Sequence, residues 1–276
     1  MSATLWLVAT PIGNLGDLAP RAVEVLASAA LVCCEDTRRT GRLLQHAGVR
    51  AQRLAVANEH TEYERIGDVL AVLGDGFDVA VVTDAGTPGV SDPGERLVRA
   101  ALDAGYVVSA VPGPAAAVTA LVISGLPTGR YVFEGFLPRS GRERTIRLRD
   151  VAAERRTVVL YEAPHRIART LADLADVCGG ERQVAVAREL TKLYEEVQRG
   201  TLASAAADVG EPRGEYVIVL AGASEVAAEV DDAAIEAALR DAIAGGATRK
   251  DAAAAVATQL AIPRKRAYTI VTTLAP

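Results

Sequence analysis

Short apolar runs alternate with amphipathic stretches over the first 113 residues. TLWLVA at 4–9 and VAVVT at 79–83 are apolar at nearly every position, whereas residues 62–73 carry apolar side chains three and four positions apart. Continuous apolar runs are typical of parallel strands covered on both faces, and the wider spacing is typical of helices. The pattern predicts an N-terminal α/β domain, residues 1–113. Its strands are expected at 4–9, 31–34, 53–57, 79–83 and 107–111, and its helices at 20–28, 41–47, 62–73 and 95–104.

The pattern changes after residue 113. Two strands follow one another near 183–199 without a helix between them, which indicates an antiparallel pair and a mixed sheet. We therefore expect a second α/β domain, residues 114–222. Its strands are expected at 131–134, 157–161, 183–188, 195–199 and 216–220, and its helices at 115–124, 142–153, 167–177 and 202–208. The acidic stretch ASEVAAEVDD then predicts a linker, and the helical patterns beyond it predict a small helical domain, residues 231–276.

Composition narrows the class of protein. The chain has 276 residues, which suggests about two larger domains, and its 50% apolar and 24% charged content excludes a disordered chain. No apolar run approaches the ~18 residues of a membrane helix, and no basic region precedes the apolar residues 5–9, so neither a membrane span nor a signal peptide is expected. Three cysteines without CxxC spacing argue against a disulfide framework and a cysteine zinc site. We expect a cytoplasmic enzyme that holds no metal.

Basic residues are concentrated in patches, although the net charge is −5. Residues 139–156 contain seven Arg against three acidic residues, and residues 38–53 contain five Arg and no acidic residue. Such patches on an acidic body indicate contacts with a polyanion at chosen places, whereas any one patch taken alone is better explained as a solvated helix face. The candidate contacts are Arg38, Arg39, Arg139, Arg142, Arg264, Lys265 and Arg266.

Glycine and proline gather where three of the predicted strands end. TPIGNL at 10–15, DAGTPGVSDPG at 84–94 and PGP at 112–114 each follow an apolar run. In an open α/β sheet the ligand lies outside the carboxyl ends of the strands. Glycine allows a ligand to approach the backbone and proline stiffens the loop. The three loops together predict a backbone-lined pocket for a flat polar ligand.

The common nucleotide and metal signatures are absent from the sequence. It contains no GxxxxGK[ST], no GxGxxG after a strand and no HExxH. A P-loop site, a standard dinucleotide site and a zinc-protease site are therefore not supported. The histidines at 46, 60 and 165 are widely spread, and each is interpreted as a surface or loop residue.

An ordered set of motifs resembles one family. The motifs are TPIGNLGD at 10–17, EDTRRTGRLL at 35–44, DAGTPGVSDPG at 84–94, VPGPAAAVTAL at 111–121, GLPTGRYVFEGFLPR at 125–139, YEAPHR at 161–166 and RELTK at 188–192. The chain resembles the ribosomal small-subunit RNA methyltransferase I family from about residue 5 to 222, and more weakly beyond. It departs from the family pattern within residues 59–62 and at Ala115 and Ala163, where a small hydroxyl residue is common.

The resemblance implies a fold, a cofactor and a substrate. The fold is two α/β domains of the tetrapyrrole-methylase type, a class III methyltransferase, with a cleft between them and a small all-helical C-terminal region. The cofactor is S-adenosylmethionine, and the acceptor is the ribose 2′-hydroxyl of a decoding-centre cytidine in 16S rRNA within the small ribosomal subunit. A homodimer is expected. The matching cofactor positions are Pro11, Ala85, Gly86, Thr87, Val90, Ala115, Ala116, Tyr161, Glu162 and Leu190.

A ribose hydroxyl is a poor nucleophile while protonated, so a group that accepts or orients its proton is expected in the cleft. Lys192 is the preferred candidate because a lysine can lose its proton when buried and an arginine effectively cannot. Glu189 could orient it, and Asp84 or Glu35 are other candidates for the catalytic group. A surface ion pair or a phosphate contact explains Lys192 equally well.

The tail at 246–271 is similar to a helix-turn-helix, with a turn at 261–263 and a basic second helix. Two alternatives to an rRNA methyltransferase remain. A tetrapyrrole ring methylase would need a large apolar or aromatic acceptor cleft, yet the chain is only 4% aromatic. A catalytically silent RNA-binding assembly factor would not need three intact cofactor loops.

Overall fold

The structure is a computed structural model that describes residues 3–224, 231–260, 262 and 264–274. The chain forms two compact units, residues 1–222 and 223–276. Residues 225–230 of the predicted linker and residues 261 and 263 of the predicted turn lie outside the described residues. Within the described part, no helix is long and apolar enough to cross a membrane.

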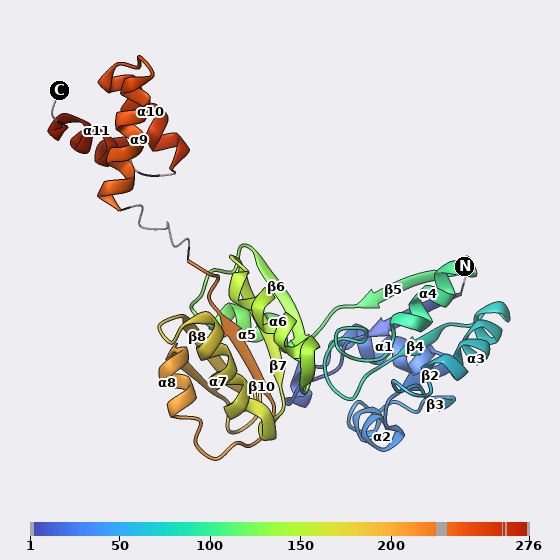
Figure 1. Ribbon diagram of the computed structural model, residues 1–276. Helices are drawn as coiled ribbons and strands as arrows, with labels where there is room; N and C mark the ends of the chain where they lie inside the picture. Colours follow the sequence, from blue (N-terminus) through green and yellow to red (C-terminus); the bar gives the residue numbers. More distant parts are fainter. Residues whose placement is uncertain (1–2, 225–230, 261, 263, 275–276) are drawn as a thin grey trace. The chain divides into compact units, whose positions relative to one another are not determined.

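The first sheet contains five parallel strands in the order β3-β2-β4-β1-β5 (Figure 1). The central strand β1 pairs with β4 on one side and with β5 on the other, so that Leu5 lies opposite both Val79 and Val108. Chain connections reverse direction at this point, which is where open α/β sheets bind ligands. The predicted parallel sheet is confirmed. Its strands are β1 Thr4–Val8, β2 Leu31–Cys34, β3 Leu54–Val56, β4 Val79–Val81 and β5 Val107–Val111.

Helices cover both faces of the first sheet. One cluster of buried side chains joins Leu5 and Val79 to α3 and α4, and another joins Val8 and Ala80 to α1 and α2. Every residue of β2 and β4 is buried, but Val107 in the edge strand β5 is 46% exposed. The prediction that all five strands are covered on both faces is therefore wrong for β5. The elements are η1 Leu15–Asp17, α1 Pro20–Ser28, α2 Thr37–His46, α3 Glu62–Gly74 and α4 Glu95–Asp103.

Helix α2 begins four residues before the predicted start at 41. The Asp36 side chain accepts a hydrogen bond from the backbone N–H of Arg38 and caps the helix there. The motif EDTRRT therefore continues from the end of β2 directly into a helix, and not into a loop.

The second sheet is mixed, in the order β6-β7-β10-β8-β9. Strands β6 and β7 are parallel, whereas β10 is antiparallel to both β7 and β8, and β8 is antiparallel to β9. The antiparallel pair predicted near 183–199 is confirmed. The strands are β6 Tyr131–Phe136, β7 Thr157–Glu162, β8 Gln183–Arg188, β9 Glu196–Thr201 and β10 Tyr216–Leu220.

The two faces of the second sheet have different neighbours. Helices α6, α7 and α8 pack on the face that contains Leu160 and Ile218, and α5 packs on the face that contains Val159 and Val217. Ile12, from the loop after β1, joins the second cluster, so the first loop of the N-terminal sheet packs into the core of the second sheet. The helices are α5 Ala116–Ile123, α6 Gly141–Ala153, η2 Pro164–Arg166, α7 Ile167–Cys178 and α8 Leu202–Ala207.

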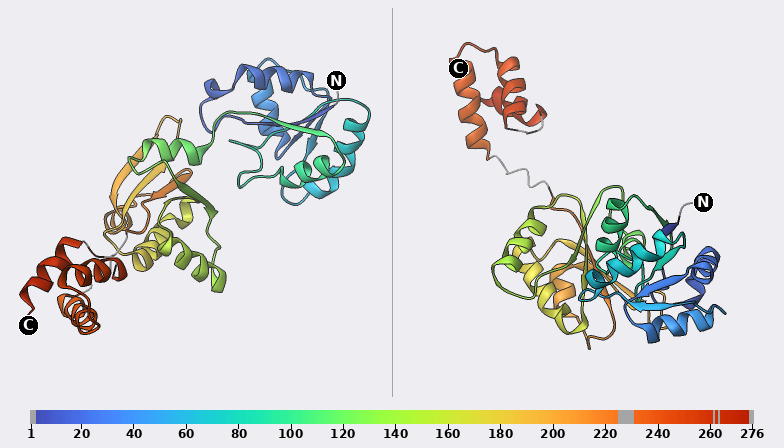
Figure 2. Two further views of the ribbon diagram at one scale, coloured as in Figure 1. Left: turned by 90° about the horizontal axis from the view of Figure 1, so that it is seen from above. Right: turned by 90° about the vertical axis from the view of Figure 1, so that its right-hand side faces the viewer.

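The C-terminal unit has a core of its own. Helices α9 Asp232–Ala244, α10 Arg249–Gln259 and α11 Arg264–Thr273 pack around Leu239, Val256 and Val271 (Figure 2, red). Side chains of Asp231 and Thr248 cap the first two helices. Because each helix buries its apolar face within the unit, the predicted all-helical C-terminal region is confirmed.

Candidate ligand-binding site

A cavity of about 460 Å³ opens at the carboxyl ends of the strands of the first sheet. Residues that follow β2, β4 and β5 line one part of it, and residues at the end of β7 and the start of β10 line another. Eight of the ten predicted cofactor positions are on its wall, namely Ala85, Gly86, Thr87, Val90, Ala115, Ala116, Tyr161 and Glu162. Pro11 lines a neighbouring hollow, and Leu190 is buried in the core beside Ile12.

Three glycine- and proline-containing loops are tied together at this cavity. Thr10 and Gly86 exchange two backbone hydrogen bonds, of 2.9 and 3.1 Å, and the Thr87 hydroxyl donates to the carbonyl of Pro114 at 3.0 Å. Gly86 has φ +88°, a conformation that costs glycine little and other residues more. The loops therefore form one fixed surface, and the sequence-based expectation that they meet is correct.

Glu62 fixes the far end of the 84–94 loop, and sequence reasoning did not find this role. Its side chain is buried at the start of α3, and Oε1 accepts hydrogen bonds from the backbone N–H groups of Gly94, Arg96 and Leu97 at 2.9–3.2 Å. The helix α4 has no cap from its own N-cap residue Gly94. A carboxylate 32 positions earlier in the chain supplies that cap, so the sequence holds no local signal for it.

Tyr161 connects β7 to the start of α5. Its hydroxyl accepts a hydrogen bond from the backbone N–H of Ala117 at 3.1 Å, one of the donors at a helix start that has no partner within the helix. The ring packs edge-on against Phe133 and Phe136, with centroids 4.9 and 5.6 Å away. Burial raises the pKa of Tyr161, so its hydroxyl keeps its proton. Tyr161 and Phe136 form an apolar and aromatic part of the cavity wall.

Glu162 also lines the cavity, but its carboxylate is held by hydrogen bonds and an ion pair with neighbouring residues. Its oxygens accept from the Ala163 N–H at 2.9 Å and the Thr170 hydroxyl at 2.7 Å, and Arg166 pairs with it at 3.1 Å. The side chain is fully buried. Glu162 therefore fixes the 162–166 segment of the wall.

Four further acidic residues lie on the cavity wall besides Glu162: Glu35, Asp84, Asp92 and Glu215. Burial raises the pKa of Asp92 to about 7, with the charges of the other three adding to the effect. Burial also raises the pKa of Glu35 and of Asp84 above their ordinary values, although the Asp84 N–H donates to Glu35 and Arg39 pairs with Asp84 at 3.4 Å. The Asp84 oxygen Oδ1 is buried without a hydrogen-bond partner in the described structure. The cavity thus suits a cation and a hydrogen-bond donor.

Lys192 lies behind this wall. Its Nζ donates to Glu189 at 2.8 Å and to Glu215 at 3.2 Å, and only Glu215 of these residues reaches the cavity. Burial lowers the pKa of Lys192, but the hydrogen bond to Glu189 and the interactions with Glu215 outweigh it, so the pKa lies above its usual 10.5. The hydrogen bond with Lys192 in turn lowers the pKa of Glu189. In this arrangement both are charged at neutral pH, and the proton-accepting role of Lys192 stays a prediction.

The predicted polyanion contacts differ in their partners. Arg38 pairs with Asp36 at 2.7 Å, Arg39 lies on the cavity wall beside Asp84, and Arg266 pairs with Asp232 at 2.7 Å inside the C-terminal unit. The other four are exposed: Arg139, Arg142, Arg264 and Lys265. Arg139 additionally lines a separate hollow. Among the described residues, no group of three His, Cys, Asp or Glu side chains has the arrangement of a metal site.

Comparisons with known proteins agree with this geometry. Residues 4–206 match the family model described as Tetrapyrrole (Corrin/Porphyrin) Methylases. A Synechocystis protein named Ribosomal RNA small subunit methyltransferase I is 46% identical over 267 residues, which is 96% of this chain and 95% of that protein. The proteins of the same name from Pseudomonas aeruginosa and Mycobacterium tuberculosis are 49% and 43% identical, over 80% and 93% of this chain and 80% and 90% of their own lengths.

Solved structures show the same fold at low sequence identity. The methyltransferase CobJ superimposes with a TM-score of 0.62 at 21% identity, over 81% of this chain and 95% of that one. The uroporphyrin-III-C-methyltransferase from Thermus thermophilus gives 0.57 at 20% identity, over 83% and 98%. These likenesses show that the two α/β sheets follow the tetrapyrrole-methylase fold that the motifs indicate.

Proposed function

The chain belongs to the ribosomal RNA small subunit methyltransferase I family of the tetrapyrrole methylases, and from that premise we propose that it transfers a methyl group from S-adenosylmethionine to the ribose 2′-hydroxyl of a decoding-centre cytidine in 16S rRNA. The observation that carries the proposal is the cavity formed by the three tied loops, with carboxylates and aromatic rings on its wall. Proteins of the same name, similar over nearly the whole chain, favour rRNA over a small acceptor.

The residues of the cavity fit the proposed cofactor. A volume of about 460 Å³ lies within the range of small-molecule sites, which is ~300–1,000 Å³. Gly86 lines the cavity without a Cβ, so the adenosine part can approach the chain closely there. Asp92 and Glu215 provide negative charge for a sulfonium and an α-amino group. When bound, S-adenosylmethionine supplies an electrophilic methyl group on a good leaving group.

Asp84 is the residue that we assign to the proton of the acceptor hydroxyl. It lies on the cavity wall, and its raised pKa makes it a better proton acceptor than an ordinary aspartate. In the proposed transfer the ribose oxygen would bond to the methyl carbon as the carbon–sulfur bond breaks, the bonding electrons would stay with the departing thioether, and Asp84 would accept the hydroxyl proton. Lys192, as a cation held by Glu189 and Glu215, keeps Glu215 oriented on the wall.

The proposal is tested with tritiated S-adenosylmethionine and small ribosomal subunits that lack the modification. The expected result is label in 16S rRNA, recovered after nuclease digestion as a ribose-methylated cytidine. Label in a porphyrinoid acceptor and none in RNA would establish the tetrapyrrole ring methylase alternative. RNA binding without any cofactor binding, measured by calorimetry, would establish the silent assembly factor.

A further inference from the structure

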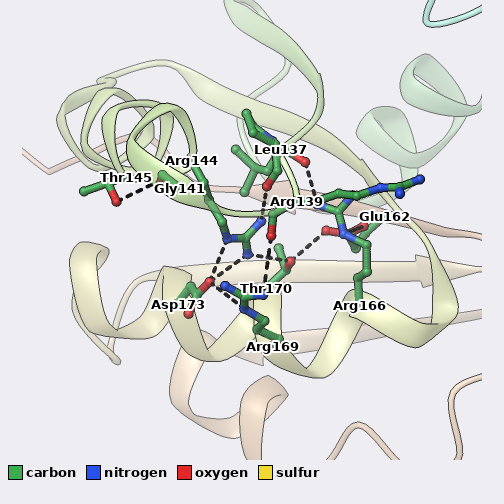
Figure 3. Close-up of polar contacts among 11 residues, drawn as sticks. Leu137, Arg139, Gly141, Arg144, Thr145, Glu162, Arg166, Arg169, Thr170 and Asp173 are labelled. Carbon is green, nitrogen blue, oxygen red and sulfur yellow. Dashed lines mark hydrogen bonds and ion pairs between the residues drawn. The ribbon is translucent and has the colours of Figure 1, made fainter.

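A second hollow, of about 350 Å³, lies beside the 162–166 segment of the cavity wall. Its lining is almost entirely cationic or donating: Arg139, Arg144, His165, Arg166, Arg169 and Thr170. Figure 3 shows Arg144 and Arg169 beside Thr170 and Asp173, and Arg166 beside Glu162 and Leu137. Four guanidinium groups face two carboxylates, those of Glu162 and Asp173, so the hollow has an excess of positive charge.

Two of the arginines form a fixed floor. Arg144 is 4% exposed and donates to Asp173 at 2.7 and 2.9 Å, to the carbonyl of Pro138 at 2.9 Å and to the Thr170 hydroxyl at 3.0 Å. Arg166 pairs with Glu162 and also donates to the carbonyl of Leu137. These buried contacts hold two cationic groups in place, which removes the entropic cost of ordering them around an anion.

The other two arginines keep most of their donors available at the rim. Arg169 is 62% exposed, and among the described residues it makes only a 3.7 Å ion pair with Asp173 and a 3.4 Å contact with the carbonyl of Arg139. The Arg139 side chain is exposed and has no hydrogen bond or ion pair within the described structure. A guanidinium presents a planar fork of donors that matches phosphate oxygens. A fixed cationic floor with an exposed cationic rim suits a phosphate group.

The hollow and the cavity share one short segment of chain. Glu162, Ala163 and Pro164 line the cavity, and His165 and Arg166 line the arginine hollow. The two sites therefore adjoin one another along a single backbone segment. A ribose and its neighbouring phosphate in one RNA strand are also adjacent, because they are covalently joined.

We propose that this arginine hollow binds a backbone phosphate of the substrate RNA next to the nucleotide that is methylated. The proposal rests on the proposed function, since the same strand must reach the cavity. Arg139 and Arg169 contact the phosphate, while Arg144 and Arg166 set the charge and shape of the floor. The hollow thereby positions the acceptor ribose without reading its base.

The test compares two charge-matched double variants. Arg139→Gln with Arg169→Gln removes the rim of the hollow, and Arg99→Gln with Arg130→Gln removes two exposed arginines that do not line it. Binding to small subunits is measured against salt concentration in the absence of cofactor, and methyl transfer is measured separately. We expect the rim variant to reduce the log–log salt slope by about 0.7–0.9, the value for loss of one phosphate contact, and the control to change it less.

Three further readouts separate the outcomes. The rim variant should keep wild-type cofactor affinity and thermal stability, and its KM for the subunit should rise more than its kcat falls. If the wild-type chain binds and methylates subunits but the rim variant has the same salt slope as the control variant, the proposal for the arginine hollow is overturned and the proposed function is not. A wild-type chain that neither binds nor methylates them would overturn the proposed function with it. Saturable binding of inorganic phosphate, lost in the rim variant without a change in the RNA slope, would assign the hollow to a free anion instead.

Discussion

The backbone N–H of Asn14 donates a 3.0 Å hydrogen bond to the Thr191 hydroxyl, 177 positions later in the chain. This contact joins the loop after the first strand to the loop that contains Lys192. It requires Gly13 beside it, because a Cβ at Gly13 would lie 2.5 Å from Lys192 Cγ, 2.7 Å from Thr191 Oγ1 and 2.9 Å from the Leu190 carbonyl. Packing of these two loops therefore depends on the absence of one methyl group.

Replacing Gly13 by alanine should separate the two loops. The added methyl meets backbone as well as side-chain atoms, and overpacking of this kind costs ~1–3 kcal/mol. We expect lower thermal stability together with weaker binding of S-adenosylmethionine in calorimetry. The control is Gly67→Ala in α3, where no heavy atom lies within 4 Å of the new Cβ and the helix gains ~0.5–1 kcal/mol. Normal affinity and stability in Gly13→Ala would show that the loops adapt.

Loss of the Glu62 cap should loosen the 84–94 loop. Glu62→Ala leaves three backbone N–H groups of Gly94, Arg96 and Leu97 without their acceptor. We expect the free energy of unfolding to fall by ~2–3 kcal/mol, and cofactor affinity to fall with it. Glu62→Gln keeps the accepting oxygen and should recover most of the loss. Equal behaviour of the two variants in denaturant unfolding would mean that burial, and not the cap, is what matters.

These two contacts show what sequence patterns can and cannot reveal. The strands and the three loops were predictable because apolar periodicity and glycine–proline turns are local signals, and the eight wall residues were predictable from the resemblance of the ordered motifs to one family. The Glu62 cap depends on a partner 32 positions away, and the ionisation of Lys192 depends on Glu215, 23 positions away. Local sequence made Lys192 the preferred proton acceptor, whereas its two carboxylate partners raise its pKa. Electrostatic environments of this kind exist only after the chain has folded.

The raised pKa of Asp92 predicts a pH dependence of cofactor binding. Because that pKa is about 7, Asp92 is largely neutral at pH 6 and largely ionised at pH 8, and the ionised form attracts a sulfonium. Affinity for S-adenosylmethionine should rise across this range, by up to ~tenfold for each unit by which binding lowers the pKa. Asp92→Asn should bind S-adenosylmethionine more weakly, and its affinity should vary less with pH. Asp103→Asn, at an exposed position of α4, should match the wild type. An unchanged profile in Asp92→Asn would assign the titration to another group.

The same shift predicts the pH dependence of stability. Native Asp92 retains its proton up to a pH of about 7, whereas the unfolded chain releases it near 3.8. The native state therefore binds more protons between these values, and the contribution of Asp92 to the free energy of unfolding falls as pH rises through that window. Asp92→Asn should remove this slope. Denaturant midpoints at pH 5 and 8 for the two proteins provide the measurement, and parallel changes in both would contradict the assignment.

Two conservative substitutions distinguish Asp84 from Lys192 as the group that accepts the hydroxyl proton. Asp84→Asn removes the proton acceptor, so turnover should fall by ~10²–10⁴-fold while S-adenosylmethionine affinity changes little. Lys192→Arg preserves a cation that can pair with Glu189 and Glu215, so we expect activity within a few fold of the wild type and an unchanged pH–rate profile. The opposite result, an active Asp84→Asn and an inactive Lys192→Arg, would restore the lysine as the group that accepts the proton.

The C-terminal unit provides the last prediction. Arg264 and Lys265 are exposed at the start of α11, whereas Arg266 pairs with Asp232 and is committed to the unit itself. If the exposed pair contacts rRNA phosphates, Arg264→Gln with Lys265→Gln should lower the log–log salt slope of subunit binding by about 1.4–1.8, at ~0.7–0.9 per contact. Cofactor affinity should not change, because every residue that lines the cavity belongs to residues 1–222. Arg266→Gln serves as the contrast. It should lower the thermal stability of the helical unit and leave the salt slope close to that of the wild type. A wild-type slope in the Arg264/Lys265 variant would mean that the three helices contribute packing or assembly, and that the RNA is held by the α/β unit alone.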